Sequence, residues 1–268
     1  MPRDPKATGF IRDLDRKLDE FCDNLRYFHE PFNEGRARTF VMQHRLNTRV
    51  RNSILKLKVA TNTPDWDTRL DIIGAASEEL IADDEFGGGL PHWQILENLG
   101  VRIGMSRAQI RTARPLKSTQ LAWNAWHGVM SNVHWLEGLL ANVILERPNI
   151  PGYGKGIIKK HGWFGLERAR WKKLFGLKDD DLVFFKLHEE ADEIHSDLGW
   201  RNLAKFAKQL QMEGQLLAMA DQNLAIWEHY LNGIGAAGDE LEEKLRKGRK
   251  RKPAARTRKS RLQFRKAA

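Results

Sequence analysis

Apolar residues recur at the spacing of an α-helix along almost the whole chain, and this pattern restricts the possible fold more than any other feature. Residues 9–29 carry apolar side chains at intervals of three and four, and residues 118–146 form a longer apolar segment of the same kind. No segment alternates polar and apolar residues between turn residues, as a half-buried β-strand does. The 268 residues suffice for one large core. We therefore predict an all-α fold, a single bundle of seven or eight helices.

Capping and helix-breaking residues set the expected boundaries. Ser106 is placed to cap a short helix, Pro148 and Pro151 stop the long apolar helix, and the last helix is expected to end at Gly233 and Gly235. The predicted helices cover residues 9–29, 34–60, 68–82, a segment from about 91, a short segment after 106, and residues 118–146, 179–195 and 202–231.

The net charge of +10 comes from one end of the chain. Residues 244–268 hold 13 Lys and Arg and no Asp or Glu, which leaves 32 basic and 35 acidic side chains in residues 1–243. We predict a helical domain over 1–243 and a basic, disordered tail over 244–268. The tail is either a solvated extension or a tether to an acidic partner, and nucleic acid is expected to bind only there.

The expected location of the protein is the cytoplasm. Residues 1–21 are charged throughout and lack the apolar core of a secretion signal. No apolar stretch approaches the roughly 20 residues that a membrane span needs. The single cysteine, Cys22, excludes disulfides and multi-thiolate metal sites within one chain.

Two histidines and an aspartate share one stripe of the predicted helix over 179–195. Asp192 and His195 lie four and seven residues beyond His188, and an α-helix places all three within about 40° of one direction. The stripe borders the apolar face of that helix, formed by Val183, Phe184, Leu187, Ala191 and Ile194. Burying such polar groups costs free energy unless a partner compensates, so the stripe indicates a functional site.

Other helices offer matching groups. Glu85 and His92, in EFGGGLPH, are seven residues apart and share a face if the segment is helical. Helical bundles build dinuclear carboxylate sites from such pairs on different helices. A third helix should then provide a bridging carboxylate, for which Glu146 is the candidate and Glu137 the alternative.

The predicted ligands are thus three carboxylates and three imidazoles. They are Glu85, His92, Glu146, His188, Asp192 and His195. Two divalent ions would offset the desolvation of the carboxylates. Oxygen and nitrogen ligands without thiolate suit iron or manganese, although zinc and copper bind such sites more tightly.

At these motifs the chain resembles the haem-oxygenase-like diiron oxidases and oxygenases, relatives of the pyrroloquinoline-quinone synthase and thiaminase folds. The resemblance covers roughly residues 28–200 and rests on FNEGRARTFVMQHRL, EFGGGLPHWQILENLG, ILERPNIP and FFKLHEEADEIH. It implies that Glu85 and His92 are the first ligands, Glu146 the bridging ligand, and His188, Asp192 and His195 the closing trio. An insertion, KKHGWFGLERARWKK, lengthens the interval between Glu146 and His188.

The resemblance implies a haem-oxygenase-like bundle that binds two ferrous ions and uses O2 as a co-substrate. Such enzymes desaturate, cleave or N-oxygenate small organic molecules, often amino acids or fatty acids. A homodimer is expected, and an external electron donor is a further partner that this chemistry admits.

Two other functions remain open. One is a non-catalytic helical interaction protein whose basic tail binds nucleic acid or an acidic partner. The other is a cofactorless oxidase of the same fold. The presence of all six predicted metal ligands argues against this second function. A thiaminase-like nucleophile is not expected, because Cys22 lies in the first helix.

Overall fold

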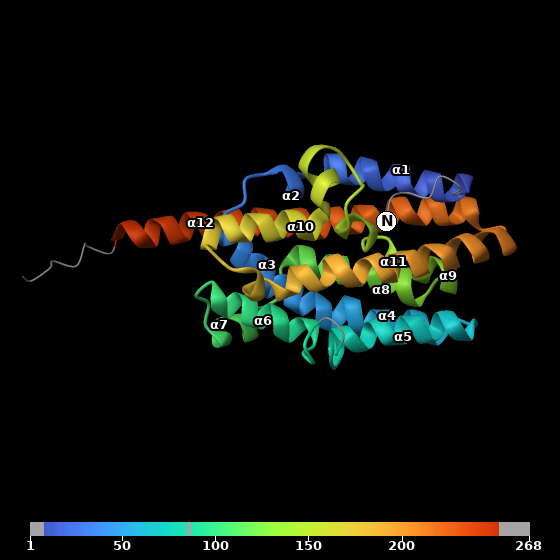
Figure 1. Ribbon diagram of the computed structural model, residues 1–268, viewed down its shortest axis with the longest axis horizontal. Coiled ribbons are helices and arrows are strands. Elements are labelled where there is room, and N and C mark those ends of the chain that lie inside the picture. Colours follow the sequence, from blue (N-terminus) through green and yellow to red (C-terminus); the bar gives the residue numbers. More distant parts are fainter. Residues whose placement is uncertain (1–7, 85–86, 252–268) are drawn as a thin grey trace, which may run out of the picture.

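The computed structural model describes residues 8–84 and 87–251, except for the side chains of residues 190, 193–196 and 250–251. Twelve α-helices lie within the described residues (Figure 1). They are α1 (Gly9–Asn24), α2 (Arg26–His29), α3 (Glu34–Arg49), α4 (Lys56–Asn62), α5 (Trp66–Leu80), α6 (His92–Arg102), α7 (Arg107–Arg111), α8 (Lys117–Ser131), α9 (Trp135–Val143), α10 (Gly156–Phe175), α11 (Val183–Gln209) and α12 (Glu213–Arg251). A π-helix, η1 (Val50–Leu55), and two 3₁₀ turns, η2 (Arg147–Asn149) and η3 (Asp179–Asp181), complete the described elements.

The all-α prediction agrees with this structure, but the predicted number of seven or eight helices is too low. Three predicted helices are divided: 9–29 becomes α1 and α2, η1 separates α3 from α4, and residues 132–134 separate α8 from α9. At the last of these breaks, the backbone N–H of His134 donates to Glu137 Oε2 at 3.0 Å, closing a capping box that starts a new helix. Helix α10, for which no helix was predicted, accounts for the remaining difference, and Ser106 caps the short helix α7 as predicted.

The last helix does not end at Gly233 and Gly235, so that prediction is wrong. Helix α12 continues for 39 residues to Arg251, which includes the first part of the predicted tail. A Cβ atom at Gly233 would lie 2.2 Å from Ser118 Oγ, and one at Gly238 would lie 2.5 Å from Arg36 Cα. These glycines are therefore needed for close packing against α8 and α3 rather than for ending the helix.

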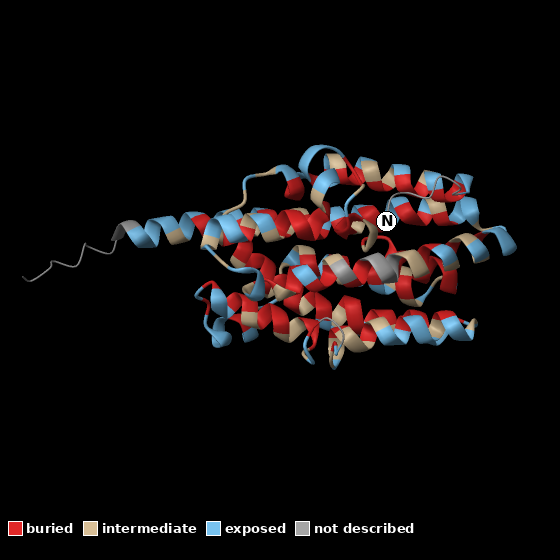
Figure 2. Ribbon diagram, in the orientation of Figure 1, coloured by how far each residue is buried: buried red, intermediate tan, exposed pale blue. Residues whose placement is uncertain are grey.

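The long helices run side by side along the long axis of the molecule (Figure 1). Helix α12 packs against α3, α8 and α9, while α11 packs against α9 and α10. Buried residues follow the inward faces of the helices, and exposed residues follow the outer faces (Figure 2). No helix within the described residues is both long and apolar enough to span a membrane.

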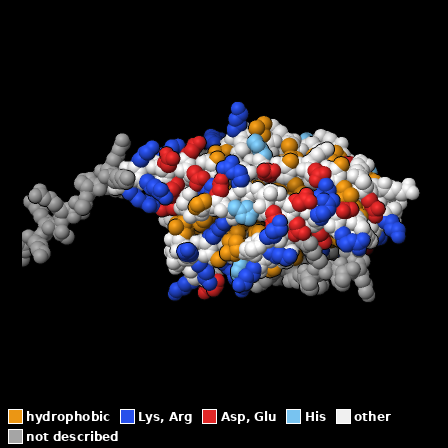
Figure 3. All heavy atoms as spheres, turned by 90° about the horizontal axis from the view of Figure 1, so that it is seen from above, with side chains coloured by type: hydrophobic (Ala, Val, Ile, Leu, Met, Phe, Trp, Pro, Cys, Tyr) orange, Lys and Arg blue, Asp and Glu red, His pale blue; other side chains and the backbone are white. Residues whose placement is uncertain are grey.

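Acidic and basic side chains are interspersed over the face seen in Figure 3. This mixing agrees with the nearly balanced charge of residues 1–243. One end of α12 projects beyond the bundle (Figure 1). Residues 252–268, most of the predicted basic tail, lie outside the described part of the chain.

The contact between α3 and α12 depends on Gly35. A Cβ atom there would lie 2.1 Å from the backbone oxygen of Gly238 and 2.4 Å from the backbone nitrogen of Glu242. The Gly35 N–H also donates to Glu242 Oε2 at 3.0 Å. Beside this contact, the buried Arg36 forms an ion pair with the half-exposed Asp239 at 2.6 Å. The start of α3 is thus locked to α12.

We expect Gly35→Ala to lower the free energy of unfolding by about 2–3 kcal/mol, because the added methyl group overlaps backbone atoms that cannot move independently. Gly128→Ala is the matched control, since a Cβ atom on Gly128 of α8 meets nothing within 4 Å. Its expected effect is a gain of up to about 1 kcal/mol from higher helix propensity. Urea unfolding of both variants measures the difference. Equal stability of the two variants would show that α3 and α12 do not approach as closely as described.

Candidate metal centre

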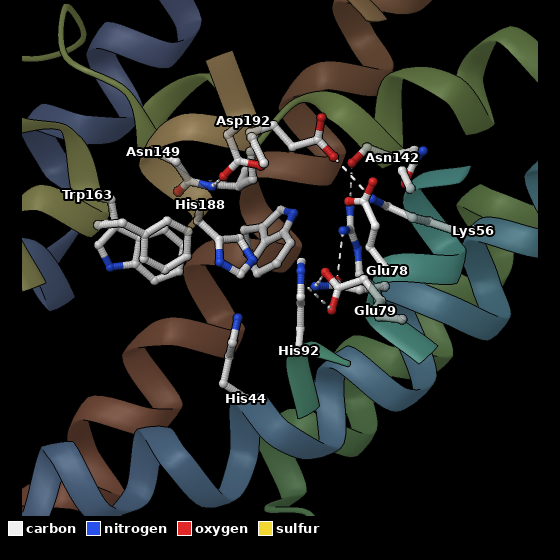
Figure 4. A pocket seen from close by; sticks show the side chains of 18 residues that line it. His44, Lys56, Glu78, Glu79, His92, Asn142, Asn149, Trp163, His188 and Asp192 are labelled. Atoms are coloured by element: carbon white, nitrogen blue, oxygen red, sulfur yellow. Dashed lines mark hydrogen bonds and ion pairs between the residues drawn. The ribbon is translucent and has the colours of Figure 1, made fainter. Parts of the chain in front are cut away.

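A polar pocket lies inside the bundle, between helices from distant parts of the chain (Figure 4). It has about 560 Å³ free of protein atoms, including its opening to solvent. Its walls come from α3, η1, α4, α5, α6, α9, η2, α10, α11, α12 and the segment between α9 and η2. Several ionisable side chains and aromatic rings meet there, so the pocket has the composition expected of a reactive site.

Glu79 of α5, His92 of α6 and His188 of α11 converge in this pocket (Figure 4). One potential ligand atom from each residue lies within 4.8 Å of those of the other two. The two imidazole rings have centroids 4.7 Å apart, and Glu79 Oε2 lies 3.3 Å from His92 Nδ1. All three residues are buried, with exposed fractions of 4–6%. A single cation can therefore contact all three side chains.

Neighbouring groups fix the orientation of these side chains. His92 Nε2 lies 3.0 Å from Asp83 Oδ2, and since the carboxylate can only accept, Nε2 carries the proton and Nδ1 turns toward Glu79. His188 Nδ1 likewise donates to the backbone oxygen of Phe184 at 2.7 Å, which leaves Nε2 as the free nitrogen. Asn52 of η1 donates to Glu79 Oε1 at 3.0 Å. Partners of this kind orient the ligands of metal sites.

The charges of the cluster are strongly coupled. Burial has the largest single effect and acts to raise the pKa of Glu79, but His92, with smaller contributions from His188 and Lys56, outweighs it and the pKa falls to about 2. Burial acts to lower the pKa of His92, but Glu79 and Asp83 raise it to about 9. Burial and the charge of His92 lower the pKa of His188 to about 3. The cluster without a metal is thus a Glu79–His92 ion pair beside a neutral His188.

Two further carboxylates line the same pocket. Lys56 Nζ donates to Glu146 Oε1 at 3.2 Å, and Asn149 Nδ2 donates to Asp192 Oδ2 at 2.6 Å. Burial, followed by the negative charge of Glu146, raises the pKa of Asp192 well above its usual value. Two carboxylates that disfavour each other's ionisation are relieved when a cation lies between them.

The buried atoms without a partner show what the pocket accommodates. Among the described residues, Glu79 Oε2, His92 Nδ1, Glu146 Oε2, Asn142 Oδ1 and Asn149 Oδ1 have no hydrogen-bond partner. Each of the four oxygens is an acceptor, and His92 Nδ1 becomes one when it loses its proton. Unpaired acceptors in a core are costly, and a metal ion satisfies several of them at once. The residues present therefore fit a divalent metal ion held by oxygen and nitrogen.

The structure places four of the six predicted ligands at this pocket: His92, Glu146, His188 and Asp192. The side chains of Glu85 and His195 lie outside the described residues, so those two assignments stay predictions. Of the two candidates for a bridging carboxylate, Glu146 lines the pocket. Glu137 instead accepts hydrogen bonds from the His134 backbone and from Gln215 at 3.0 Å.

The condition under which Glu85 and His92 would share a helix face is not met, because residues 87–91 are not helical. Helix α6 begins only at His92, and residues 87–91 form a turn closed by a bridge between Asp83 and Leu90. Gly88 and Gly89 have φ angles of 62° and 77°, which side-chain-bearing residues rarely adopt. The predicted helix beginning near residue 91 is confirmed as α6, and Glu85 lies outside the described residues.

The sequence reasoning missed Glu79, although a signal for it was present. Ile72, Ala76 and Glu79 follow one another at helical spacing within the predicted helix 68–82, and all three are buried. A carboxylate on the apolar face of a helix is the same signal that identified His188. Asn52 and Asn149 were also missed, because nothing in their spacing distinguishes them from surface amides.

The insertion before His188 forms most of α10 and contributes to the pocket wall. Trp163 and Phe164 of this helix line the pocket, and the Phe164 ring centroid lies 4.8 Å from that of His188. Gly162 interrupts the helix with a φ of 68°, and a Cβ atom there would lie 2.2 Å from the backbone oxygen of Asn149. The inserted helix thus packs directly on the residue that binds Asp192.

Comparison with known proteins identifies the family and the fold of the chain. A family model described as iron-containing redox enzyme matches residues 38–228. A crystal structure of a domain of unknown function with a haem oxygenase-like fold, from Shewanella denitrificans OS217, aligns with a TM-score of 0.65 and 13% identity, over 89% of this chain and 93% of that chain. None of the curated proteins matches the chain.

The structural likeness establishes the fold, and the predicted haem-oxygenase-like bundle is confirmed. The family match covers more than half of the chain and includes Glu79, His92, Glu146, His188 and Asp192. The chain belongs to the family of iron-containing redox enzymes.

Proposed function

We propose that this protein is a non-haem diiron oxidase or oxygenase that uses O2 to oxidise a small organic substrate, such as an amino acid or a fatty acid. The observation that carries the proposal is the convergence of Glu79, His92 and His188, in which Glu79 Oε2 and His92 Nδ1 face each other at 3.3 Å without a hydrogen bond. Family membership supports iron as the metal. Iron bound in this pocket supplies the one-electron chemistry that O2 activation requires.

The proposed ligands form two groups. Glu79, His92 and His188 would hold one iron ion. Glu146 and Asp192, together with the predicted ligand His195, would hold the second. Two sets of oxygen and nitrogen ligands in one bundle are the usual construction of dinuclear carboxylate sites.

The protein's own residues prepare the pocket for this chemistry. Asp83 and the backbone oxygen of Phe184 hold the two imidazoles in the tautomers that present a free nitrogen to the pocket. Asn52 and Asn149 each bind one carboxylate oxygen and leave other atoms of the site free. Trp163 and Phe164 cover one side with apolar rings, which limits the access of water.

The first prediction concerns iron content after expression with ample iron. Glu79→Gln and His188→Ala should each retain less than about a tenth of the wild-type iron, because the loss of one buried ligand leaves an incomplete site. His44→Asn is the matched control. His44 lines the same pocket, but its ring stacks on Phe40 at 4.7 Å and is not among the three convergent ligands. Elemental analysis of the folded proteins measures their iron content. Full iron content in Glu79→Gln would exclude this site.

The second prediction separates a two-iron centre from a one-iron centre. Wild-type protein should bind about two ferrous ions per chain in anaerobic titration, whereas Glu146→Gln and Asp192→Asn should bind about one, since the first group of ligands is intact. Lys58→Gln is a control on the same helix as Lys56, because Lys58 does not line the pocket. If wild-type protein bound one ferrous ion per chain and Glu146→Gln bound the same number, the protein would be a mononuclear iron enzyme instead.

The third prediction tests the reaction itself. Anaerobic ferrous protein should consume O2 when the gas is admitted, and consumption should speed up in the presence of a suitable amino acid or fatty acid. Glu79→Gln should consume no more O2 than the same amount of free ferrous iron. An oxygen electrode provides the measurement, with mass spectrometry for the oxidised product. Wild-type protein that binds iron yet takes up no O2 with any candidate would contradict the proposed oxidase function.

A further inference from the structure

Arg51 differs from the other fully described arginines of the core. Arg36, Arg45 and Arg51 have exposed fractions of 2%, 4% and 3%. Arg36 pairs with Asp239 at 2.6 Å, and Arg45 pairs with Glu97 at 2.6 Å. Arg51 donates only to uncharged acceptors: Asn52 Oδ1 and the backbone oxygens of Ala141 and Asn142. Within the described residues, no carboxylate lies in ion-pair contact with it.

The surroundings of Arg51 offset only part of the cost of burying its charge. The two backbone oxygens lie at the C-terminal end of α9, where the helix dipole favours a cation. The guanidinium also lies over the rings of Trp126 and Trp227, at 5.5 and 4.8 Å from their centroids. Burial lowers the pKa of Arg51 to about 10, so the group remains charged at neutral pH. A buried cation without an anion is an arrangement that binding of an anion stabilises.

Donor atoms without partners accompany this charge. Arg51 Nε and Trp227 Nε1 are buried and have no hydrogen-bond partner among the described residues. Both side chains line the pocket that holds Glu79, His92 and His188. The other buried cation at the pocket, Lys56, is already paired with Glu146. Arg51 is thus the cation of this pocket that remains available to a ligand.

Metal binding increases the need for an anion. Glu146 and Glu79 act on Arg51 through space, and their negative charges favour its charged form. When these carboxylates bind metal ions, their charge is offset by the metal and no longer compensates Arg51. An anion beside Arg51 is therefore expected to bind more tightly to the metal-loaded protein, and the two binding events should reinforce each other.

We infer that the pocket binds its substrate through a carboxylate that accepts hydrogen bonds from Arg51 and Trp227. This inference rests on the proposed function for the oxidation of that substrate, but the carboxylate site itself does not. A single guanidinium with one neighbouring indole N–H suits a monoanion, and a phosphate dianion would leave excess negative charge in the core. The substrate class is thus a small organic acid rather than an amine, an alcohol or a phosphate ester.

The test compares acids with their uncharged amides, using hexanoate with hexanamide and benzoate with benzamide. Isothermal titration calorimetry is carried out on metal-free protein and on protein loaded with Zn²⁺, which does not react with O2. In wild-type protein at least one acid should bind about 10- to 100-fold more tightly than its amide, as expected for a hydrogen bond to a buried charge. Arg51→Gln should reduce that preference to less than about threefold.

Trp227→Phe provides a second, milder variant, because it removes the indole N–H and keeps an aromatic ring under Arg51. It should weaken binding of the acid by about threefold to tenfold and leave binding of the amide unchanged. Circular dichroism establishes that both variants are folded. Absence of an acid preference in wild-type protein, for both pairs, would overturn the inference. Retention of the preference in Arg51→Gln would also overturn it, since the metal or another group would then bind the acid.

The outcomes separate this inference from the proposed function. Metal stoichiometry is measured on the same samples and is expected to be the same in wild type, Arg51→Gln and Trp227→Phe. Protein that prefers the acid but binds no iron would contradict only the diiron proposal. Protein that binds iron but has no preference for the acid would contradict only the carboxylate site.

Discussion

The high cost of placing charged groups inside an all-helical core dominates this structure. Glu79, His92, His188 and Asp192 line one pocket and are all nearly inaccessible to solvent. Hydrogen bonds donated by Asn52 and Asn149, and one donated by His92 to Asp83, satisfy some of their atoms and leave others open. A core that served only for packing would replace these groups with apolar side chains. The presence of these charged side chains in the core is explained if a cation binds between them.

The π-helix η1 explains how one short segment serves both halves of the pocket. It contributes Asn52, which orients Glu79, and Arg51, whose charge lacks an anion, while Lys56 follows directly after it. The wider turn of a π-helix changes which side chains share a face, and such turns are frequent at functional sites. Metal ligands and cationic side chains can thus be presented to one cavity from a single stretch of backbone.

Periodicity identified most of the helices, though not α10, and the His188–Asp192 stripe, because the i, i+4 relation holds wherever a helix forms. The same reasoning applied to Glu79 would have found it, since that residue shares a face with Ile72 and Ala76. The condition for Glu85 and His92 to share a helix face was not met, because Gly88 and Gly89 adopt left-handed conformations in a turn between them. The continuation of α12 through Gly233 could not be predicted from the sequence either. Whether a glycine ends a helix or admits a neighbour depends on what packs there, which is a property of the tertiary structure.

Gly162 joins the inserted helix α10 to the segment that carries Glu146 and Asn149. Its missing side chain leaves just enough room for the Asn149 backbone, and Asn149 in turn holds Asp192. Deletion of the insertion is therefore expected to disturb the rest of the pocket. Helix α10 and the segment that carries Glu146 and Asn149 are packed together as one unit. A change of shape in either part therefore requires compensating substitutions in the other.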